Sequence, residues 1–442
     1  MVQAKDKAQL RRSFLALTGD FTFYGFGLSF ASVVTILPAF VSKLSGSNIL
    51  IGLITTISVL GFNGPQILVT NYIEKQRTRK RFIMLYTLGE RIPWLLLAAL
   101  TVILPSSGSA LLLISFFLTY AAVNISAGIT APAWFDLVAK VVPEGRRGWY
   151  FGLSNFLATI LGVVGGAAAG FLIDSLGFPL GYAACFAAAF VLMMFSYVSL
   201  WAVDEPESNA SGSEQDLMQY LRSLPDVLRA DNLFSKYLMA TLVAGVTTMG
   251  SAFLTAHALK AVGSGEEVLG TYTAVYFASQ VLSNLVWAQL GDTRGHVSVI
   301  ALGGLLGALS SIITIFSNSV FGFCVAFALI GAFMSVINVS WAPAIMELAS
   351  EERRPTYLAL AGVLRAIPAA LAPLLGGVIA DMAGSVWIFV IATIAHLASV
   401  MIVAPVLRSP KRSEKAVAEA LESGPRGTIL ISETMDDQNQ SH

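Results

Sequence analysis

Long apolar runs recur through the 442-residue chain, and they limit the folds open to it. The hydrocarbon core of a bilayer takes about 20 apolar residues per helix. Because lipid gives the backbone no hydrogen-bond partner, and because the alternation of a barrel strand is absent, each run is expected to be a helix. We predict twelve membrane-spanning helices, at residues 14–41, 49–72, 82–104, 109–139, 149–174, 179–203, 234–260, 267–290, 297–317, 320–348, 356–381 and 386–407.

The composition is that of a membrane protein. Hydrophobic residues make up 55% of the chain and charged residues 12%, whereas soluble domains are about 25% charged. The net charge is zero, so nothing suggests a nucleic-acid partner. The sequence has no phosphate-binding loop, zinc-protease motif or serine-hydrolase motif, and we expect no enzyme activity, cofactor or metal. Cys185 and Cys324 lie in apolar runs, as small buried residues do.

The basic residues predict the orientation. With a cytoplasmic N-terminus, the cytoplasmic segments hold 23 of the 27 Lys and Arg residues, and the outer loops hold only Lys43 and Lys260. This distribution obeys the positive-inside rule. We expect a multi-pass protein of the inner or plasma membrane with both termini in the cytoplasm.

The two parts of the chain resemble each other. The segment APAWFDLVAK at 131–140 lines up with APAIMELASE at 342–351. Such duplication predicts two six-helix bundles related by a pseudo-two-fold axis along the membrane normal. Three further pairs are all 207 residues apart: Tyr150 and Tyr357, Gly170 and Gly377, Asp174 and Asp381.

This division predicts five parts. They are a cytoplasmic N-terminus at 1–13, a first bundle at 14–203, a linker at 204–233, a second bundle at 234–408 and a disordered tail at 409–442. Within the linker, residues 214–229 form either an amphipathic helix on the inner membrane surface or plain solvated chain.

A motif follows the second span of each half. In the second half, AQLGDTRGH at 288–296 has an Asp and a later Gly with an Arg between them; in the first, NYIEKQRTRKR at 71–81 keeps the order of acid and base. Both resemble the G-x-x-x-D-R-x-G-R motif of the major facilitator superfamily, although the first has Glu for Asp and lacks the glycine. The resemblance covers residues 10–408. It implies transport of a small solute by alternating access through a cavity between the halves.

Part of the antiporter pattern of that family is missing. The glycine spacing on the fifth span is kept at Gly162, Gly166 and Gly170, but Ala167 stands at the position of the family's proline. The fourth span also lacks the Arg often found in proton antiporters of the family. The resemblance therefore does not imply drug–proton antiport.

Four ionisable side chains lie inside apolar runs, where charge is costly. Asp20, in the first span, is our candidate for the proton-coupling carboxylate, and Glu90, in the third, is a second candidate. A carboxylate whose surroundings change as helices move can bind and release a proton. The alternative for each is a fixed structural salt bridge.

The two embedded arginines have different interpretations. Arg365 either binds an anionic or polar group of the substrate, pairs with a carboxylate such as Asp20 across the halves, or only packs. Arg91 is expected to be structural, because the resemblance places the third span at the periphery of its half. Neighbouring helix residues point about 100° apart, so Glu90 and Arg91 are not expected to share a face.

Polar and aromatic residues at helical spacing mark the spans that the family places around its cavity. Each either contacts substrate or makes an interhelical hydrogen bond. Amides with aromatic walls suit a sugar-like or amphipathic aromatic substrate. The substrate-binding candidates are Tyr24, Asn63, Gln66, Tyr120, Asn124, Tyr276, Gln280, Asn284, Asn338, Trp341 and Arg365.

A second set of charges lies at the predicted inner ends of the spans. These residues either form an inner gate, whose ion pairs join the halves while the cavity faces outward, or are solvated loop charges. An acid at a helix C-terminus also needs a basic neighbour. The candidates are Glu74, Asp136, Arg146, Arg147, Asp292, Arg294, Glu347, Arg353 and Arg354.

These features predict a secondary active transporter that moves a small organic solute, is coupled to protons and works as a monomer. Without an ATP-binding loop, a gradient must supply the energy. The alternatives are an uncoupled facilitator on the same scaffold, a non-transporting membrane receptor or assembly protein, and, disfavoured by the absence of a catalytic cluster, an intramembrane enzyme.

Overall fold

The computed structural model describes residues 2–74, 78–104, 110–143, 146–206, 232–263, 265–349 and 354–407. Within these ranges the chain is helical and no strand occurs, as the all-α prediction requires. Ten helical stretches among them are long and apolar enough to cross a membrane. The predicted linker stretch at 214–229 and the tail at 409–442 lie outside the described residues.

The first half, residues 2–206, begins with a long helix, α1 (Val2–Ser29), which is followed after a short break by a shorter helix, α2 (Ile36–Leu44). Its other elements are α3 (Asn48–Glu74), α4 (Lys80–Tyr86), α5 (Leu88–Ile103), α6 (Ala110–Val141), α7 (Arg147–Leu176) and α8 (Leu180–Trp201).

The second half, residues 232–407, also begins with a broken helix. Its elements are α10 (Asn232–Val246), α11 (Thr248–Val262), α12 (Val268–Arg294), α13 (His296–Phe316), α14 (Val320–Leu348), α15 (Arg354–Ala383) and α16 (Val386–Leu407). α12 and the α1–α2 pair are not among the ten apolar stretches.

Three of the predicted spans, at 14–41, 82–104 and 234–260, are each built from two consecutive helices. The breaks fall between α1 and α2, at Thr87, and at Thr247. At both threonines a backbone N–H bonds three residues back, from Glu90 to Thr87 and from Gly250 to Thr247, which is tighter than α-helical spacing. The Thr247 hydroxyl also donates to the Ala244 carbonyl (2.7 Å), a local bond that competes with the helical ladder.

The helices of the two halves keep the register that the sequence pairs predict. α7 and α15 have 30 residues each, and both ends differ by 207. Tyr150 and Tyr357, also 207 apart, are both fully buried. Each packs against a phenylalanine of the first helix of its own half, Phe14 and Phe234.

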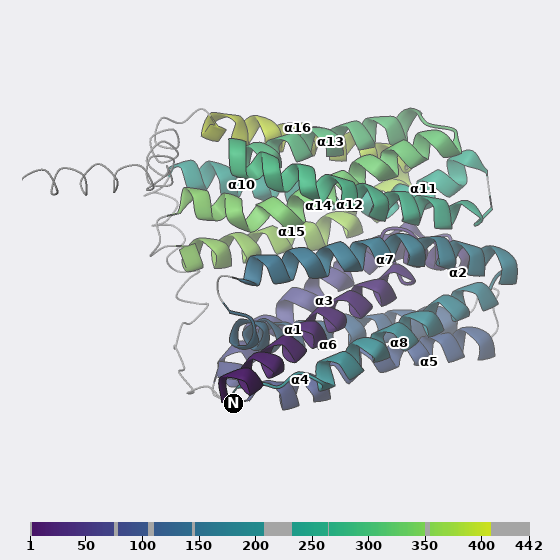
Figure 1. Cartoon of the computed structure of the whole chain (residues 1–442). Helices are drawn as coiled ribbons and strands as arrows, with labels where there is room; N and C mark the ends of the chain where they lie inside the picture. The colour runs from purple at the N-terminus through teal and green to yellow at the C-terminus, as the bar shows by residue number, and fades with distance from the viewer. Residues whose placement is uncertain are drawn as a thin grey trace, which may run out of the picture.

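Helices of the halves form two groups, which meet where α7 packs on α12 and α3 on α15 (Figure 1). Glycine allows the closest approaches. A Cβ added at Gly170 would lie 2.2 Å from the Cα of Gly270, and one at Gly52 would lie 2.1 Å from the carbonyl oxygen of Pro373. The contact between the halves is therefore backbone against backbone.

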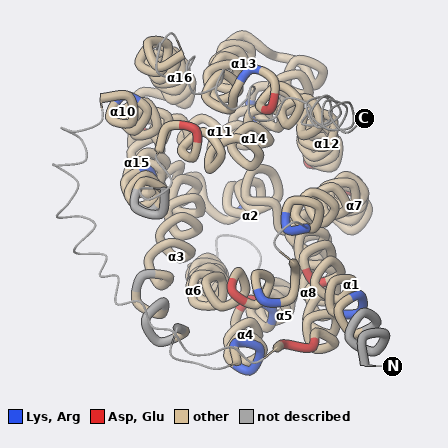
Figure 2. Tube along the Cα trace, turned by 60° about the vertical axis from the view of Figure 1, so that its left-hand side comes forward, with Lys and Arg blue, Asp and Glu red and all other residues tan. Residues whose placement is uncertain are grey.

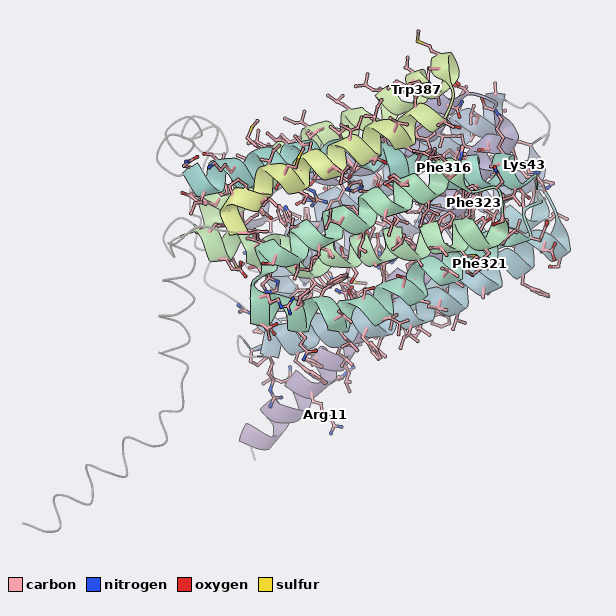
Figure 3. The ribbon with its side chains drawn as sticks, turned by 90° about the horizontal axis from the view of Figure 1, so that it is seen from above. Arg11, Lys43, Phe316, Phe321, Phe323 and Trp387 are labelled. Carbon is pink, nitrogen blue, oxygen red and sulfur yellow. The ribbon has the colours of Figure 1, made fainter. Side chains whose placement is uncertain are left out.

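The two ends of the molecule are called the terminus side and the far side. The terminus side holds the start of α1 and the end of α16, and the far side holds α2 and the turns into α3 and α12 (Figure 1). Arg11 lies on the terminus side, whereas Lys43 and the exposed aromatic residues Phe316, Phe321 and Trp387 lie towards the far side (Figure 3). Aromatic residues at that level are typical of a membrane interface.

Candidate functional site

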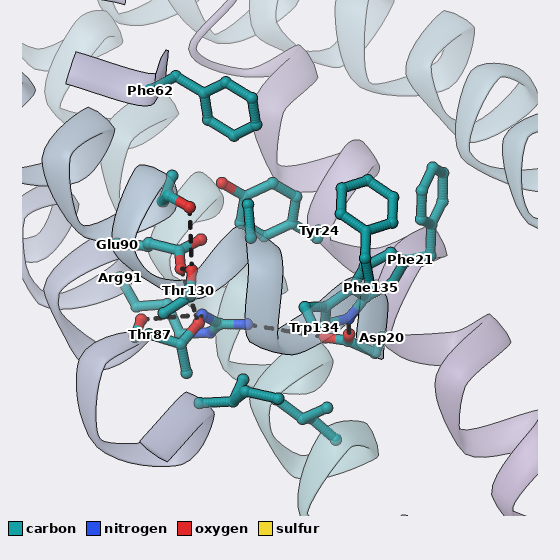
Figure 4. Close-up of a pocket in the computed structure, with 14 residues that line it drawn as sticks. Asp20, Phe21, Tyr24, Phe62, Thr87, Glu90, Arg91, Thr130, Trp134 and Phe135 are labelled. Carbon is teal, nitrogen blue, oxygen red and sulfur yellow. Dashed lines mark hydrogen bonds and ion pairs between the residues drawn. The ribbon is translucent and has the colours of Figure 1, made fainter. Parts of the chain in front are cut away.

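A cavity of about 210 Å³ opens within the first half between α1, α5 and α6. Its walls carry the ionisable residues Asp20, Glu90 and Arg91, all of them buried, and aromatic side chains including Tyr24 and Trp134 (Figure 4). Figure 2 shows how few charged residues the helices carry, with red and blue segments lying together among α1, α4, α5, α6 and α8. The cavity thus collects three of the four embedded ionisable residues.

Arg91 holds this part of the bundle together. Its Nε donates to the Met193 carbonyl on α8 (2.9 Å), and a terminal nitrogen donates to the Thr87 carbonyl (2.8 Å) and also to the Thr87 hydroxyl. The other terminal nitrogen donates to the Ser196 hydroxyl (2.8 Å). The guanidinium therefore bridges the break between α4 and α5 to α8, and each of its nitrogens is engaged.

Asp20 is held by three groups from three helices. The Ser196 hydroxyl on α8 donates to one carboxylate oxygen (2.6 Å), and the Trp134 indole N–H on α6 donates to the other (2.7 Å). Arg91 on α5 lies 3.7 Å away. Hydrogen bonds to an ionised group are about twice as strong as neutral ones. The carboxylate is thus fixed where α1, α5, α6 and α8 meet.

Glu90 faces the same cavity from the first turn of α5. A negative charge is favourable there, because the N-terminus is the positive end of the helix dipole. The hydroxyls of Thr87 (3.1 Å) and Thr130 donate to one of its oxygens. Tyr24 lines the cavity next to it, and the Tyr24 ring lies 5.7 Å from the Arg91 guanidinium. No Lys or Arg lies within 4.0 Å of Glu90 among the described residues.

The structure shows how Asp20 is paired, and it shows that Glu90 and Arg91 point in different directions, as expected of adjacent helix residues. Asp20 pairs with Arg91 of its own half and not with Arg365, which has no carboxylate within 4.0 Å in the described part of the chain and instead lies over the Trp341 ring at 5.6 Å. Glu90 and Arg91 both line one cavity, although they are adjacent. The longer arginine side chain reaches around the helix to α8, while Glu90 turns towards α6.

A second cavity, of about 350 Å³, adjoins the first and shares Tyr24, Phe62 and Ala127 with it. It lies farther from the terminus side, between α1, α3, α5 and α6. Of the predicted substrate-binding residues, it gathers Tyr24, Asn63, Tyr120 and Asn124. Gln66, one turn along α3 from Asn63, does not line it, and its amide donates to the Phe62 carbonyl (2.8 Å).

The candidates of the second half are not gathered in the described cavities. Tyr276 and Gln280 are buried on α12. Asn284 accepts a hydrogen bond from Ser335 on α14 (2.5 Å), and the Trp341 carbonyl accepts one from Tyr237 on α10 (3.3 Å). For Asn284, this is the interhelical bonding that stood as the alternative to substrate contact. Asn338 is exposed on α14.

On the terminus side, Asp136, Asp292 and Glu347 contact groups of their own half. Asp136 pairs with Arg79 (2.9 Å) and Lys140 (3.3 Å), which provides the basic neighbour expected at the end of α6. Glu347 accepts from the backbone N–H groups of His296 and Val297 at the start of α13, and Asp292 lies 3.9 Å from His296.

The remaining gate candidates are described only in part. Arg147 donates to the Ala139 carbonyl (2.9 Å) within the first half, and Arg146 and Arg294 are exposed. The side chains of Glu74, Arg353 and Arg354 lie outside the described residues.

On the far side, by contrast, side chains join the halves. Asn48 donates to the Asp381 carboxylate (2.7 Å), and the Thr273 hydroxyl donates to that of Thr35 (2.7 Å). The Glu266 carboxylate accepts from the Tyr182 hydroxyl (2.8 Å). Side chains thus join the halves on the far side, whereas the ion pairs of Asp136 and Asp292 on the terminus side stay within their own halves.

A model of the Major Facilitator Superfamily matches residues 20–261 and again 237–435. The chain belongs to the Major Facilitator Superfamily. The match to a curated relative is shorter: an uncharacterized transporter of Buchnera aphidicola subsp. Schizaphis graminum (strain Sg) is 26% identical over 141 residues, which is 32% of this chain and 36% of that protein.

Solved transporters of this superfamily have the same fold. The D-xylose–proton symporter matches with a TM-score of 0.65 at 16% identity, covering 87% of this chain and 96% of its own. The nucleoside transporter NupG matches with a TM-score of 0.65 at 12% identity, covering 89% and 98%. At these identities the likeness shows the fold alone. Family and fold together show a multi-pass membrane transporter.

Sequence analysis missed four residues that complete the site of this transporter. Thr130 and Trp134 hold the two carboxylates from α6, Thr87 bonds both Glu90 and Arg91, and Ser196 lies between Arg91 and Asp20. One signal was available, because Thr130 and Trp134 are four residues apart and so share a face of their helix. Ser196 carries no such signal in an apolar run.

Proposed function

We propose that this transporter is a secondary active carrier that moves a small organic solute by alternating access and is coupled to protons. The observation that carries the proposal is the charge of the buried cavity in the first half. Two carboxyl groups, Asp20 and Glu90, share it with one guanidinium, that of Arg91. If both carboxyl groups are ionised, one negative charge has no partner there.

An unpaired charge is expensive in a cavity of this kind, because the low-dielectric surroundings do not solvate it. The nitrogens of Arg91 are already engaged by Thr87, Met193 and Ser196. The cavity therefore favours one additional cation, and a proton is the one that fits between hydrogen-bonded side chains. Asp20 is the proposed coupling carboxylate because it contacts α5, α6 and α8 at once, so movement of any of them changes its surroundings.

The contacts between the halves support alternating access. They lie on the far side, while the charges of the terminus side pair within each half. With a cytoplasmic N-terminus, the terminus side faces the cytoplasm, so the space between the two halves would open inward. We propose that Asp136, Asp292 and Glu347 exchange partners across the halves when the cavity faces outward. The α1–α2 pair and α12 complete the twelve spans, in two six-helix bundles of a monomeric protein in the inner or plasma membrane.

The test is solute flux in proteoliposomes under an imposed pH gradient. Asp20→Asn keeps the shape of the side chain and removes its charge. We expect it to abolish pH-driven accumulation while leaving equilibrium exchange of the solute. Asp174→Asn is the matched control, because Asp174 is exposed at the end of α7 and lies outside the cavities of the first half.

Two results decide between this proposal and an uncoupled facilitator. Accumulation that persists in Asp20→Asn would exclude coupling through Asp20, and the same experiment on Glu90→Gln then tests the second carboxyl group. Flux of the unmodified protein that does not change when the proton gradient is dissipated would support the facilitator.

A further inference from the structure

The second cavity of the first half differs from the first in carrying no charge. Its volume is about 350 Å³, and none of its lining residues is Asp, Glu, Lys, Arg or His. Ligand pockets for small molecules range upward from roughly 300 Å³. The polar lining residues are Tyr24, Ser58, Asn63, Trp94, Tyr120 and Asn124.

Two of these polar groups are buried beside the cavity. Trp94 is 1% exposed and Tyr120 is 3% exposed. Among the described residues the indole N–H of Trp94 has no hydrogen-bond partner, and the hydroxyl of Tyr120 lies beside the side chains of Ser58 and Asn124. Buried polar groups in native proteins are generally bonded, so a group left open beside a cavity suggests a missing ligand.

The amides of the cavity supply the opposite kind of group. The Asn63 amide nitrogen donates to the Val59 carbonyl (2.7 Å), and that of Asn124 donates to the Tyr120 carbonyl (2.8 Å). Each amide nitrogen is thus turned to its own helix, which leaves the side-chain oxygen to accept. The cavity combines an indole donor, a hydroxyl and two amide acceptors between aromatic walls.

We propose that this cavity is a substrate subsite for an uncharged group that both accepts and donates hydrogen bonds, of the class of a hydroxylated ring such as a sugar. The Trp94 N–H and the Tyr120 hydroxyl bind its acceptor oxygens, and the Asn63 and Asn124 amide oxygens bind its hydroxyls. A charged group is excluded, because no lining residue offers it a counter-ion. The inference rests on the proposed transport function and names the substrate class for it.

The geometry also links this subsite to the charged cavity. Tyr24, Phe62 and Ala127 line both, and Tyr24 lies beside Glu90 and Arg91 on the charged side. A solute in the subsite would touch the side chain that covers the coupling carboxyl groups. Tyr24 would therefore contact both the bound solute and the cavity that holds the proposed proton-binding carboxyl groups.

The experiment measures binding to the purified full-length protein by the shift in thermal unfolding. The probes are matched neutral and acidic compounds: glucose and uridine against glucuronate and uridine monophosphate. Trp94→Phe removes the indole N–H and keeps an aromatic ring, and Tyr120→Phe removes only the hydroxyl. Trp387→Phe is the control, because Trp387 is exposed on the far side (Figure 3).

We expect at least one neutral probe to bind more tightly than its acid, and Trp94→Phe and Tyr120→Phe each to weaken that binding about tenfold, as expected for the loss of a hydrogen bond in a buried site. Trp387→Phe should leave it unchanged. Three results would overturn the inference: binding of no neutral probe, preference for the acids, or unchanged affinity in both cavity variants. The coupling proposal fails separately, through pH-driven accumulation in Asp20→Asn.

Discussion

The two halves of this transporter share their packing but not their chemistry. Among the described residues, every buried Asp, Glu, Lys and Arg lies in the first half, as Asp20, Arg79, Glu90 and Arg91. The buried polar groups of the second half are His396, Gln280 and hydroxyl groups. The first half therefore holds a cavity with three buried charged groups, whereas the second half has the half-buried Arg365, which lies over the Trp341 ring.

What the halves have in common is the contact surface between them. Gly170 and Gly377 stand at related positions on α7 and α15, and each lets its helix touch the backbone of the opposite half. The aromatic pair of Phe14 and Tyr150 has its counterpart in Phe234 and Tyr357. Positions that decide how close helices approach are alike in the two halves, whereas positions that hold charge are not.

The largest expected effect comes from removing the two embedded arginines, one in each half. Arg91→Leu leaves Asp20 without its cation and removes the guanidinium as a donor to the Thr87 and Met193 carbonyls. Breaking a buried pair costs roughly 3–5 kcal/mol. Arg365→Leu loses mainly its contact with the Trp341 ring, worth about 0.5–2 kcal/mol. Thermal unfolding of the purified protein measures both.

Replacing the two carboxylates of the cavity by amides tests whether the stranded negative charges cause the loss of stability. Adding Asp20→Asn and Glu90→Gln to Arg91→Leu removes the stranded charges, so the triple variant should recover part of the lost stability. Equal destabilisation by the two arginine variants would contradict the asymmetry of the halves.

A smaller effect, alike in both halves, is expected at the paired glycines. The Cβ of Gly170→Ala would lie 2.2 Å from the Cα of Gly270, and that of Gly377→Ala 2.5 Å from the Cα of Ile49. Because backbone cannot turn aside, each variant should separate the halves on the far side, at a cost of about 1–3 kcal/mol.

Labelling of a cysteine placed on the far side by a membrane-impermeant maleimide measures this separation, in a background without Cys185 and Cys324. Both variants should raise the labelling rate. Gly148→Ala is the control, because nothing lies within 4 Å of its added Cβ. An increase in only one of the two variants would show that the related glycines do not play the same part.

The sequence was sufficient to predict an all-helical membrane protein, because that follows from local hydrophobicity. It did not predict the partner of Asp20. Arg91 lies 71 positions away on a span assigned to the periphery, and only the packing of α5 and α8 against α1 brings its guanidinium to the carboxylate. The sequence also did not predict that the Trp94 N–H lacks a partner among the described residues. The pattern of an apolar run does not indicate whether the indole nitrogen contacts a neighbouring side chain or a cavity.

The breaks in the helices could not be predicted for a different reason. Thr87 and Thr247 interrupt spans that are apolar on both sides of the break, so hydropathy is continuous across them. Both breaks are accompanied by local hydrogen bonds, from Arg91 and the Glu90 N–H to Thr87 and from Thr247 to Ala244, and hydropathy does not report such bonds. The break at Thr87 matters to the proposed coupling, because it places Glu90 in the first turn of a new helix.

The smallest expected effect tests whether the shared aromatic pairs stabilise through their rings or their polar groups. The Tyr150 hydroxyl donates to the Leu17 carbonyl on α1 at 3.2 Å, while the ring packs against Phe14. Tyr150→Phe removes only that hydrogen bond, so thermal unfolding should show a loss of roughly 0.5–1.5 kcal/mol, with transport unchanged. A loss as large as that of Arg91→Leu would mean that the hydroxyl holds α1 against α7. A small loss would mean that the ring contact, which both halves share, carries most of the stabilisation. The polar groups of the two halves could then differ without loss of the common packing.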